Sequence, residues 1–108
     1  MNGAMQDSSL VGAWTHSFEE DEGDVQVFRP SHAFAFPLSR RGRESLEFGA
    51  SGEVKSSEPG PDDRYRASTS SLTPLGMNRY RIGATAGKPD RVVEVVERAP
   101  DLLKLRFL

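Results

Sequence analysis

Apolar and polar residues alternate with a period of two along much of this chain, and this pattern constrains its fold more than any other feature. At the C-terminal end, Leu103, Leu105 and Phe107 alternate with Lys104 and Arg106. Successive side chains of a β-strand point to opposite faces, so this period predicts strands that each bury one face. The same alternation recurs in the segments 10–18, 24–29, 45–49 and 78–83.

Turn-forming residues separate these segments at short, even intervals, which is typical of an antiparallel meander. The segment 58–63 contains two prolines, which cannot donate to a sheet ladder, and Thr73 to Gly76 is a further predicted turn. Four valines in 92–96 favour a strand there, because β-branched side chains lose rotamer freedom in a helix. The predicted strands cover residues 10–18, 24–29, 45–49, 53–57, 64–72, 78–83, 91–98 and 102–107.

About eight short strands must hide their edges, and closure into a barrel removes the edges completely. We therefore predict a single all-β domain over residues 10–108, an antiparallel up-and-down β-barrel of about eight strands, preceded by a flexible N-terminal tail at 1–9. A flattened sandwich is the alternative. The interior of an eight-stranded barrel is either filled by side chains or wide enough to hold one small ligand.

Composition excludes several classes of function. The chain has no cysteine, which rules out disulfides, thiolate catalysis and cysteine-based metal sites. Its formal net charge of −2 lacks the dominant basic field that nucleic acid or an anionic membrane requires. Residues 1–7 have neither the basic start nor the apolar run of a signal peptide. We therefore expect a cytoplasmic protein, a monomer or weak homodimer, that needs no cofactor and binds neither nucleic acid nor membrane.

Catalytic patterns are missing from the sequence. The two histidines are His16, on the same face of its strand as Trp14, and His32, in a predicted turn. No serine stands in a nucleophile elbow, and no order of Ser, His and Asp suggests a triad. The acidic run 19–24 lacks the alternating oxygen spacing of a calcium loop. We expect no metal site and no enzymatic activity.

The most unusual segment is 28–43, which combines three phenylalanines, two prolines and four arginines. In the functional interpretation, Phe34 and Phe36 line the mouth of a cavity, and nearby arginines meet an anionic ligand or partner. In the structural interpretation, the phenylalanines belong to the core and the arginines balance the acidic run on the surface. The arginines that would contact a partner are Arg40, Arg41 and Arg43.

The first predicted strand opens with Gly12-Ala13-Trp14, which resembles the Gly-x-Trp signature of lipocalins and other calycins. In that family the Trp closes one end of an up-and-down barrel, and an Arg of the last strand packs over its ring. The resemblance therefore implies structural roles for Gly12 and Trp14, with Arg106 over the indole and Arg98 as the second choice. The chain length is closer to compact bacterial lipocalin-like domains and small calycin protease inhibitors than to typical lipocalins.

These observations lead to two functional hypotheses. The first is a non-catalytic, lipocalin-like binding protein that holds a small, partly apolar ligand inside the barrel. The residues expected to line that ligand are Trp14, His16, Phe34, Phe36, Phe48 and Tyr80. The alternative is a protein-interaction or inhibitor module that binds through its loops, with segment 29–43 as the contact surface.

Overall fold

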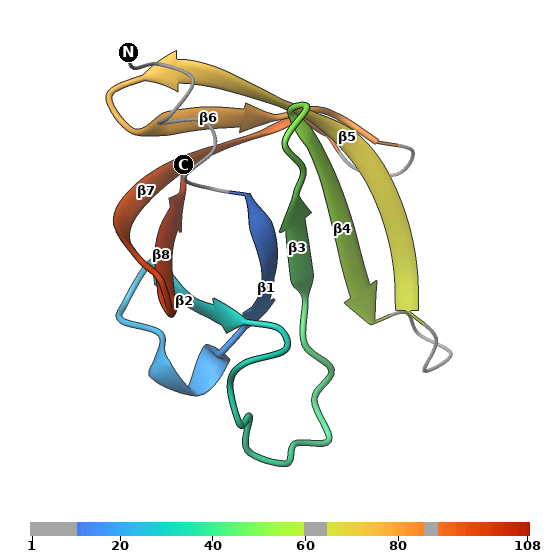
Figure 1. The fold of residues 1–108 in the computed structure, drawn as a ribbon, viewed down its shortest axis with the longest axis vertical. Coiled ribbons are helices and arrows are strands. Elements are labelled where there is room, and N and C mark those ends of the chain that lie inside the picture. The colour runs from blue at the N-terminus through green and yellow to red at the C-terminus, as the bar shows by residue number, and fades with distance from the viewer. Residues whose placement is uncertain (1–10, 60–64, 86–88) are drawn as a thin grey trace.

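The computed structural model describes residues 11–59, 65–85 and 89–108, and these form a closed antiparallel β-barrel of eight strands (Figure 1). The predicted all-β, up-and-down barrel is confirmed. The predicted flexible tail at 1–9 lies outside the described residues. In the described part of the chain, no helix is long and apolar enough to cross a membrane. The elements are β1 (Gly12–His16), the 3-10 turn η1 (Phe18–Glu20), β2 (Val25–Pro30), β3 (Ser45–Phe48), β4 (Glu53–Pro59), β5 (Tyr65–Gly76), β6 (Arg79–Ile82), β7 (Arg91–Ala99) and β8 (Leu102–Phe107).

The barrel combines a meander with one hairpin in reversed order. Strands β3 to β8 pair in sequence, whereas β2 pairs with β8 and β1 pairs with β3. In a strictly sequential barrel, β1 would be the neighbour of β8. The reversal has a consequence for the connection 31–44, which must pass β1 to lead from β2 to β3.

Thr15 holds the two ends of this connection together. Its Oγ1 lies 2.7 Å from Oγ of Ser31, directly after β2, and 3.1 Å from Oγ of Ser45, the first residue of β3. Trp14 and His16, its neighbours in β1, are buried in the barrel, so the alternation along the strand puts Thr15 on the outer face. The crossover is thus fastened to the outside of β1 by three hydroxyl groups.

The barrel interior is packed with apolar side chains. Pairing of Phe28 with Leu103 and of Trp14 with Leu46 points all four side chains inward. Each fully buried large apolar side chain stabilises the fold by about 1.5–3 kcal/mol relative to an exposed one. The core cluster comprises Trp14, Phe28, Leu46, Phe48, Val54, Ile82, Val93, Leu103 and Leu105.

Strand β2 buries side chains on both of its faces. Val25 and Val27 pair with Arg106 and Lys104 of β8, which places them on the outer face of the barrel. They are nevertheless buried, because the β1–β2 connection (17–24) folds over them. The amide of Ser17 donates to the carbonyl of Val27 at 2.8 Å, and the Val27 amide donates to Oδ1 of Asp21 at 2.9 Å. The alternation at 24–29 therefore marks a covered outer face rather than the core.

The predicted turn at Thr73 to Gly76 is wrong, because β5 continues through these residues to Gly76. A register shift between Pro74 and Gly76 accommodates the proline, and Pro74 pairs with Tyr80. The reversal occurs two residues later, at Met77 and Asn78, which both adopt positive φ angles (54° and 63°). Such angles are typical of a tight hairpin turn, in which asparagine is well tolerated.

Candidate functional site

Trp14 is 4% exposed and packs in the core, and Arg98 of β7 lies over its indole, with the guanidinium carbon 5.9 Å from the ring centroid. Arg106 does not take this place. It lies on the outer face, 2.9 Å from Glu94 and 3.2 Å from Asp24. The physical reason is strand parity: Arg106 stands between Leu105 and Phe107, whose side chains point inward.

The backbone conformation at the start of β1 explains why residue 12 is a glycine. Its φ of +141° is a conformation that L-residues rarely adopt, and a Cβ there would lie 3.6 Å from Nε1 of Trp14. That Nε1 is buried and has no hydrogen-bond partner among the described residues. The start of β1 is therefore shaped around the indole.

The residues predicted to line a ligand do not surround one cavity. Trp14, His16 and Phe48 are buried inside the barrel, and Tyr80 packs against the same core. Phe34 and Phe36 do not join them, because β2 ends at Pro30 and both lie in the connection 31–44 outside the strands. Inside the barrel, nine buried apolar residues of the described chain, Trp14 and Phe48 among them, pack into one cluster.

His16 fastens the β1–β2 connection. Its Nε2 lies 3.0 Å from each carboxylate oxygen of Asp21, whose Oδ1 also accepts the Val27 amide. The ring stacks on Phe28, with centroids 5.1 Å apart, and meets the edge of Phe18 at 5.9 Å. All of these partners belong to the fold itself, so the arrangement positions the connection rather than a substrate.

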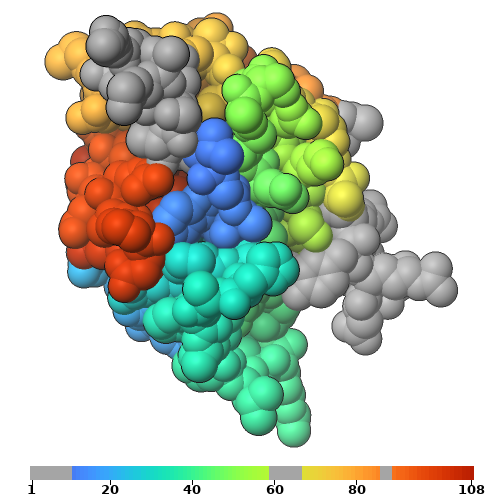
Figure 2. All heavy atoms as spheres, in the orientation of Figure 1, coloured from blue at the N-terminus to red at the C-terminus, as the bar shows by residue number. Residues whose placement is uncertain are grey.

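The aromatic and arginine side chains of the connection 31–44 and of Arg29 form a cluster with the acidic β1–β2 connection (17–24). Figure 2 shows this part of the chain projecting from the body of the barrel. Phe34 and Phe36 meet edge to face, with centroids 4.8 Å apart. The guanidinium of Arg29 lies 5.1 Å from the Phe34 ring, and that of Arg43 lies 5.0 Å from the Phe36 ring. These contacts pack the aromatic rings under arginine planes on the outside of the barrel.

Carboxylates of the acidic connection neutralise two of these arginines. Arg29 donates to Glu20 at 2.8 Å, and Arg43 donates to Glu19 at 2.6 Å. Hydrogen bonds from Arg29 and from the Ser17 hydroxyl lower the pKa of Glu20 to about 2. A hydrogen bond from Arg43 likewise lowers the pKa of Glu19. Arg40 and Arg41 remain exposed to solvent.

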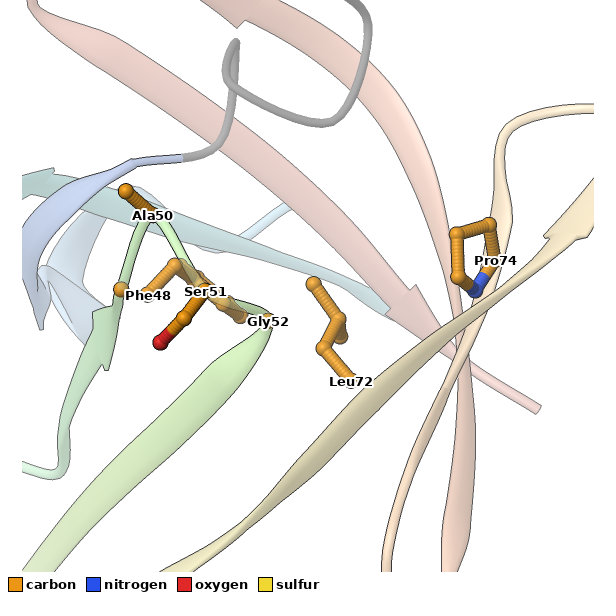
Figure 3. Close-up of a pocket in the computed structure, with 7 residues that line it drawn as sticks. Phe48, Ala50, Ser51, Gly52, Leu72 and Pro74 are labelled. Carbon is orange, nitrogen blue, oxygen red and sulfur yellow. The ribbon is translucent and has the colours of Figure 1, made fainter. Parts of the chain in front are cut away.

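A pocket of about 230 Å³ opens at the barrel mouth beside the β3–β4 turn (Figure 3). Phe48 and Leu72 contribute apolar side chains from β3 and β5, and Pro74 borders the far side. The turn itself supplies mostly backbone, because residues 49–52 read Gly-Ala-Ser-Gly. The complete lining is Phe48, Gly49, Ala50, Ser51, Gly52, Leu72 and Pro74.

Local chemistry fixes the shape of this turn. A Cβ on Gly49 would stand 2.8 Å from side-chain carbons of Glu53, so a larger residue would force that side chain to move. Gly52 has a φ of +87° and offers its carbonyl to the Leu72 amide at 2.7 Å. The Ser51 hydroxyl donates to the Glu53 carboxylate. The turn is thereby tied to β5 across the pocket.

The sequence pointed to Phe48 as a residue lining a ligand, and the structure places it at this pocket, whereas the sequence did not point to Leu72 or Pro74. Ala50-Ser51-Gly52 predicts a hairpin tip, because small residues and glycine favour a tight turn, but it does not predict that the tip lines a pocket. That the tip faces Leu72 follows from the β4–β5 register, in which Glu53 pairs with Ser71, and no local pattern reports this pairing.

Within the described ranges, no group of three or more His, Asp or Glu side chains is placed to hold a metal ion. Comparisons of the chain with protein-family models, curated proteins and solved structures found no match.

Proposed function

We propose that this chain is a non-catalytic binding protein for a small, partly apolar molecule, which enters the pocket at the β3–β4 turn. The observation that carries the proposal is a pocket of about 230 Å³ with a floor of Phe48, which is only 3% exposed. An apolar cavity of about 150 Å³ accommodates benzene, and drug-sized molecules need about 300–1,000 Å³. The pocket volume therefore suits one ring or a short branched chain.

Polar groups at the rim support a ligand with one polar substituent. The lining includes the backbone of Gly49 to Gly52 and the Ser51 hydroxyl, whereas the floor is apolar. A molecule with an apolar body and one hydroxyl, amine or carboxyl group would bury the body against Phe48 and Leu72. Its polar group would stay at the rim, where water and the turn can pair with it.

The resemblance to lipocalins supports the same use of the barrel. Gly12-Ala13-Trp14 opens β1, the barrel has eight antiparallel strands, and an arginine lies over the tryptophan. The proposal differs from the sequence-based hypothesis in the place of the ligand. The sequence-based hypothesis put the ligand inside the barrel, whereas this pocket lies at the barrel mouth, with Phe48 as the shared lining residue.

The test is a titration of ¹⁵N-labelled protein with indole, followed by amide chemical shifts. We expect saturable shifts confined to residues 48–52 and 72–74, the segments that line the pocket. Leu72→Phe, which fills the pocket, should abolish them. Leu75→Phe is the matched control, because Leu75 lies on the same strand but outside the lining.

Both variants are first checked for a cooperative thermal unfolding transition, since overpacking costs about 1–3 kcal/mol. Equal indole binding by the folded Leu72→Phe variant would show that the pocket is not the site. Absence of any shift at millimolar indole would sink the proposal in its present form.

A further inference from the structure

A groove runs along the outer face of the barrel, over β1, β3 and β4. One hollow of about 510 Å³ has a floor of small side chains that includes Ala13, Ser57 and Ala67. A second hollow of about 390 Å³ continues from it beneath residues 37–43. Thr15 and Ser45 line both hollows, so the two form one continuous depression. None of its lining residues belongs to the pocket at the barrel mouth.

The groove floor suits an extended main chain. Small side chains let a second backbone approach the sheet closely, and hydroxyl groups can both donate to and accept from its peptide groups. The described strands each have two neighbours in the closed barrel, so a partner cannot bind by adding a strand to an edge. Recognition must then come from side chains that line the groove.

The charges along the groove leave an excess of positive charge. Glu47 stands opposite Lys55 in the β3–β4 register, so these two charges offset each other. Arg43 is bound to Glu19. Arg41 lines the groove with no carboxylate partner among the described residues, and its guanidinium carbon is held 4.2 Å from the centroid of the Phe18 ring.

An apolar contact lies next to this cation. Leu38 lines the same hollow and its side chain is completely exposed to solvent. A large exposed apolar side chain beside a pre-oriented arginine is the kind of anchor pair that protein interfaces use. We propose that the groove docks an extended polypeptide segment of a partner protein that carries a carboxylate next to an apolar side chain. The carboxylate meets Arg41, and the apolar side chain packs against Leu38.

The test uses a defined acidic probe, the blocked hexapeptide Ala-Leu-Asp-Leu-Asp-Ala, titrated into ¹⁵N-labelled protein. We expect amide shifts in β1, β3, β4 and residues 38–43, with the mouth pocket unaffected. A counterpart with Asn in place of Asp should bind about five-fold more weakly, the value of one surface ion pair near 1 kcal/mol. Arg41→Ala should lower the affinity for the acidic peptide by the same factor.

Two matched controls separate the groove from general charge effects. Arg81→Ala removes another exposed arginine outside the groove and should leave peptide affinity unchanged. Ala67→Trp fills the groove floor and should abolish binding, whereas Thr73→Trp, exposed on the same strand outside the groove, should not.

Three outcomes would overturn the inference: no shifts at millimolar peptide, equal binding of the Asn counterpart, or stronger shifts of the same amides by a ten-nucleotide oligo-dT. The last result would assign the groove to single-stranded nucleic acid. Because the groove and the mouth pocket share no lining residue, a failure here leaves the indole experiment and the proposed function untouched.

Discussion

The β1–β2 connection and the β3–β4 turn both join neighbouring strands, at opposite ends of the barrel, but they are held in place differently. The connection 17–24 is fastened by side chains: Asp21 binds His16 and the Val27 amide, and Glu20 binds Arg29. The turn 49–52 has almost no side chains and is held to β5 by the backbone bond from Leu72 to Gly52. The connection covers the outer face of β2, whereas the turn leaves a pocket of about 230 Å³ beside it.

The two segments differ because one carries large side chains and the other carries almost none, and not because of the strands that they join. Both ends rest on the same packed core, in which Phe28 and Phe48 are almost fully buried. The charged connection folds back over the strand that follows it and buries Val25 and Val27. The Gly-Ala-Ser-Gly turn has no side chain large enough to fill the space in front of Phe48.

The largest effect should come from truncating a core side chain beside the β1–β2 connection. Phe28→Ala removes a completely buried ring that stacks on His16, and should lower the free energy of unfolding by about 3–5 kcal/mol. Leu72→Ala, at the pocket beside the β3–β4 turn, should lower the free energy of unfolding by only about 1 kcal/mol, because Leu72 is already partly exposed and lines the pocket. Urea denaturation of both variants measures the difference. Equal costs would mean that the two ends are packed alike.

The next effect concerns the fastening of the connection. Asp21→Ala leaves the His16 ring and the buried Val27 amide without their acceptor, and should cost about 1–3 kcal/mol in unfolding free energy. Asp21→Asn is the matched control, since its amide oxygen still accepts the Val27 hydrogen bond, and it should lose less. Hydrogen exchange of the Val27 amide reports the site directly. A Val27 amide as well protected in Asp21→Ala as in the parent would contradict the assigned role.

Much of this contrast could not be predicted from sequence, for definable reasons. The period of two gave the strands and the closed barrel, because alternation reports which side chains share a face. It does not report which strands are neighbours, so the reversed β1–β2 hairpin was invisible. It also does not say which face is the core, and Val25 and Val27 turn out to lie on the covered outer face.

The residues of the candidate site also fall into those that the sequence indicates and those that only the strand pairing brings together. Phe48 was predicted because an aromatic residue on the apolar face of a strand must enter the barrel. Leu72 and Pro74 complete the pocket only through the register in which β5 pairs with β4, and the sequence predicted a turn at Pro74 where β5 continues. Arg106 shows the opposite case: strand parity with Leu105 and Phe107 already pointed it outward, so the sequence contained the evidence against its place over Trp14.

A smaller and pH-dependent effect should mark the acidic connection. The pKa of Glu20 is lowered from 4.5 to about 2, chiefly by the hydrogen bond from Arg29, so its folded form favours the charged carboxylate. The resulting stabilisation is complete above about pH 4.5 and is lost as the pH falls toward 2. Because the Glu20 side chain is 36% exposed, solvent screening limits the effect to about 1 kcal/mol or less.

Glu20→Gln should therefore be less stable than the parent at pH 7 and equally stable near pH 2, as measured by urea unfolding at both values. Arg29→Met tests the cause, since it removes the main donor and should abolish most of the same pH-dependent difference. A stability difference between Glu20→Gln and the parent that stays constant from pH 7 to pH 2 would contradict the assignment. The turn 49–52 has no acidic residue and offers no equivalent effect.

The smallest effect is expected at the barrel end that holds the β3–β4 turn, where Arg98, near the end of β7, lies over the Trp14 ring. Arg98→Ala removes a cation–π contact worth about 0.5–1 kcal/mol at an exposed site, and should shift the emission maximum of the single tryptophan. Arg106→Ala is the matched control, because Arg106 belongs to the last strand but binds Glu94 and Asp24 on the outer face. Its tryptophan emission should match the parent. If Arg106→Ala rather than Arg98→Ala altered the emission, the arginine of the last strand, and not Arg98, would cover the indole.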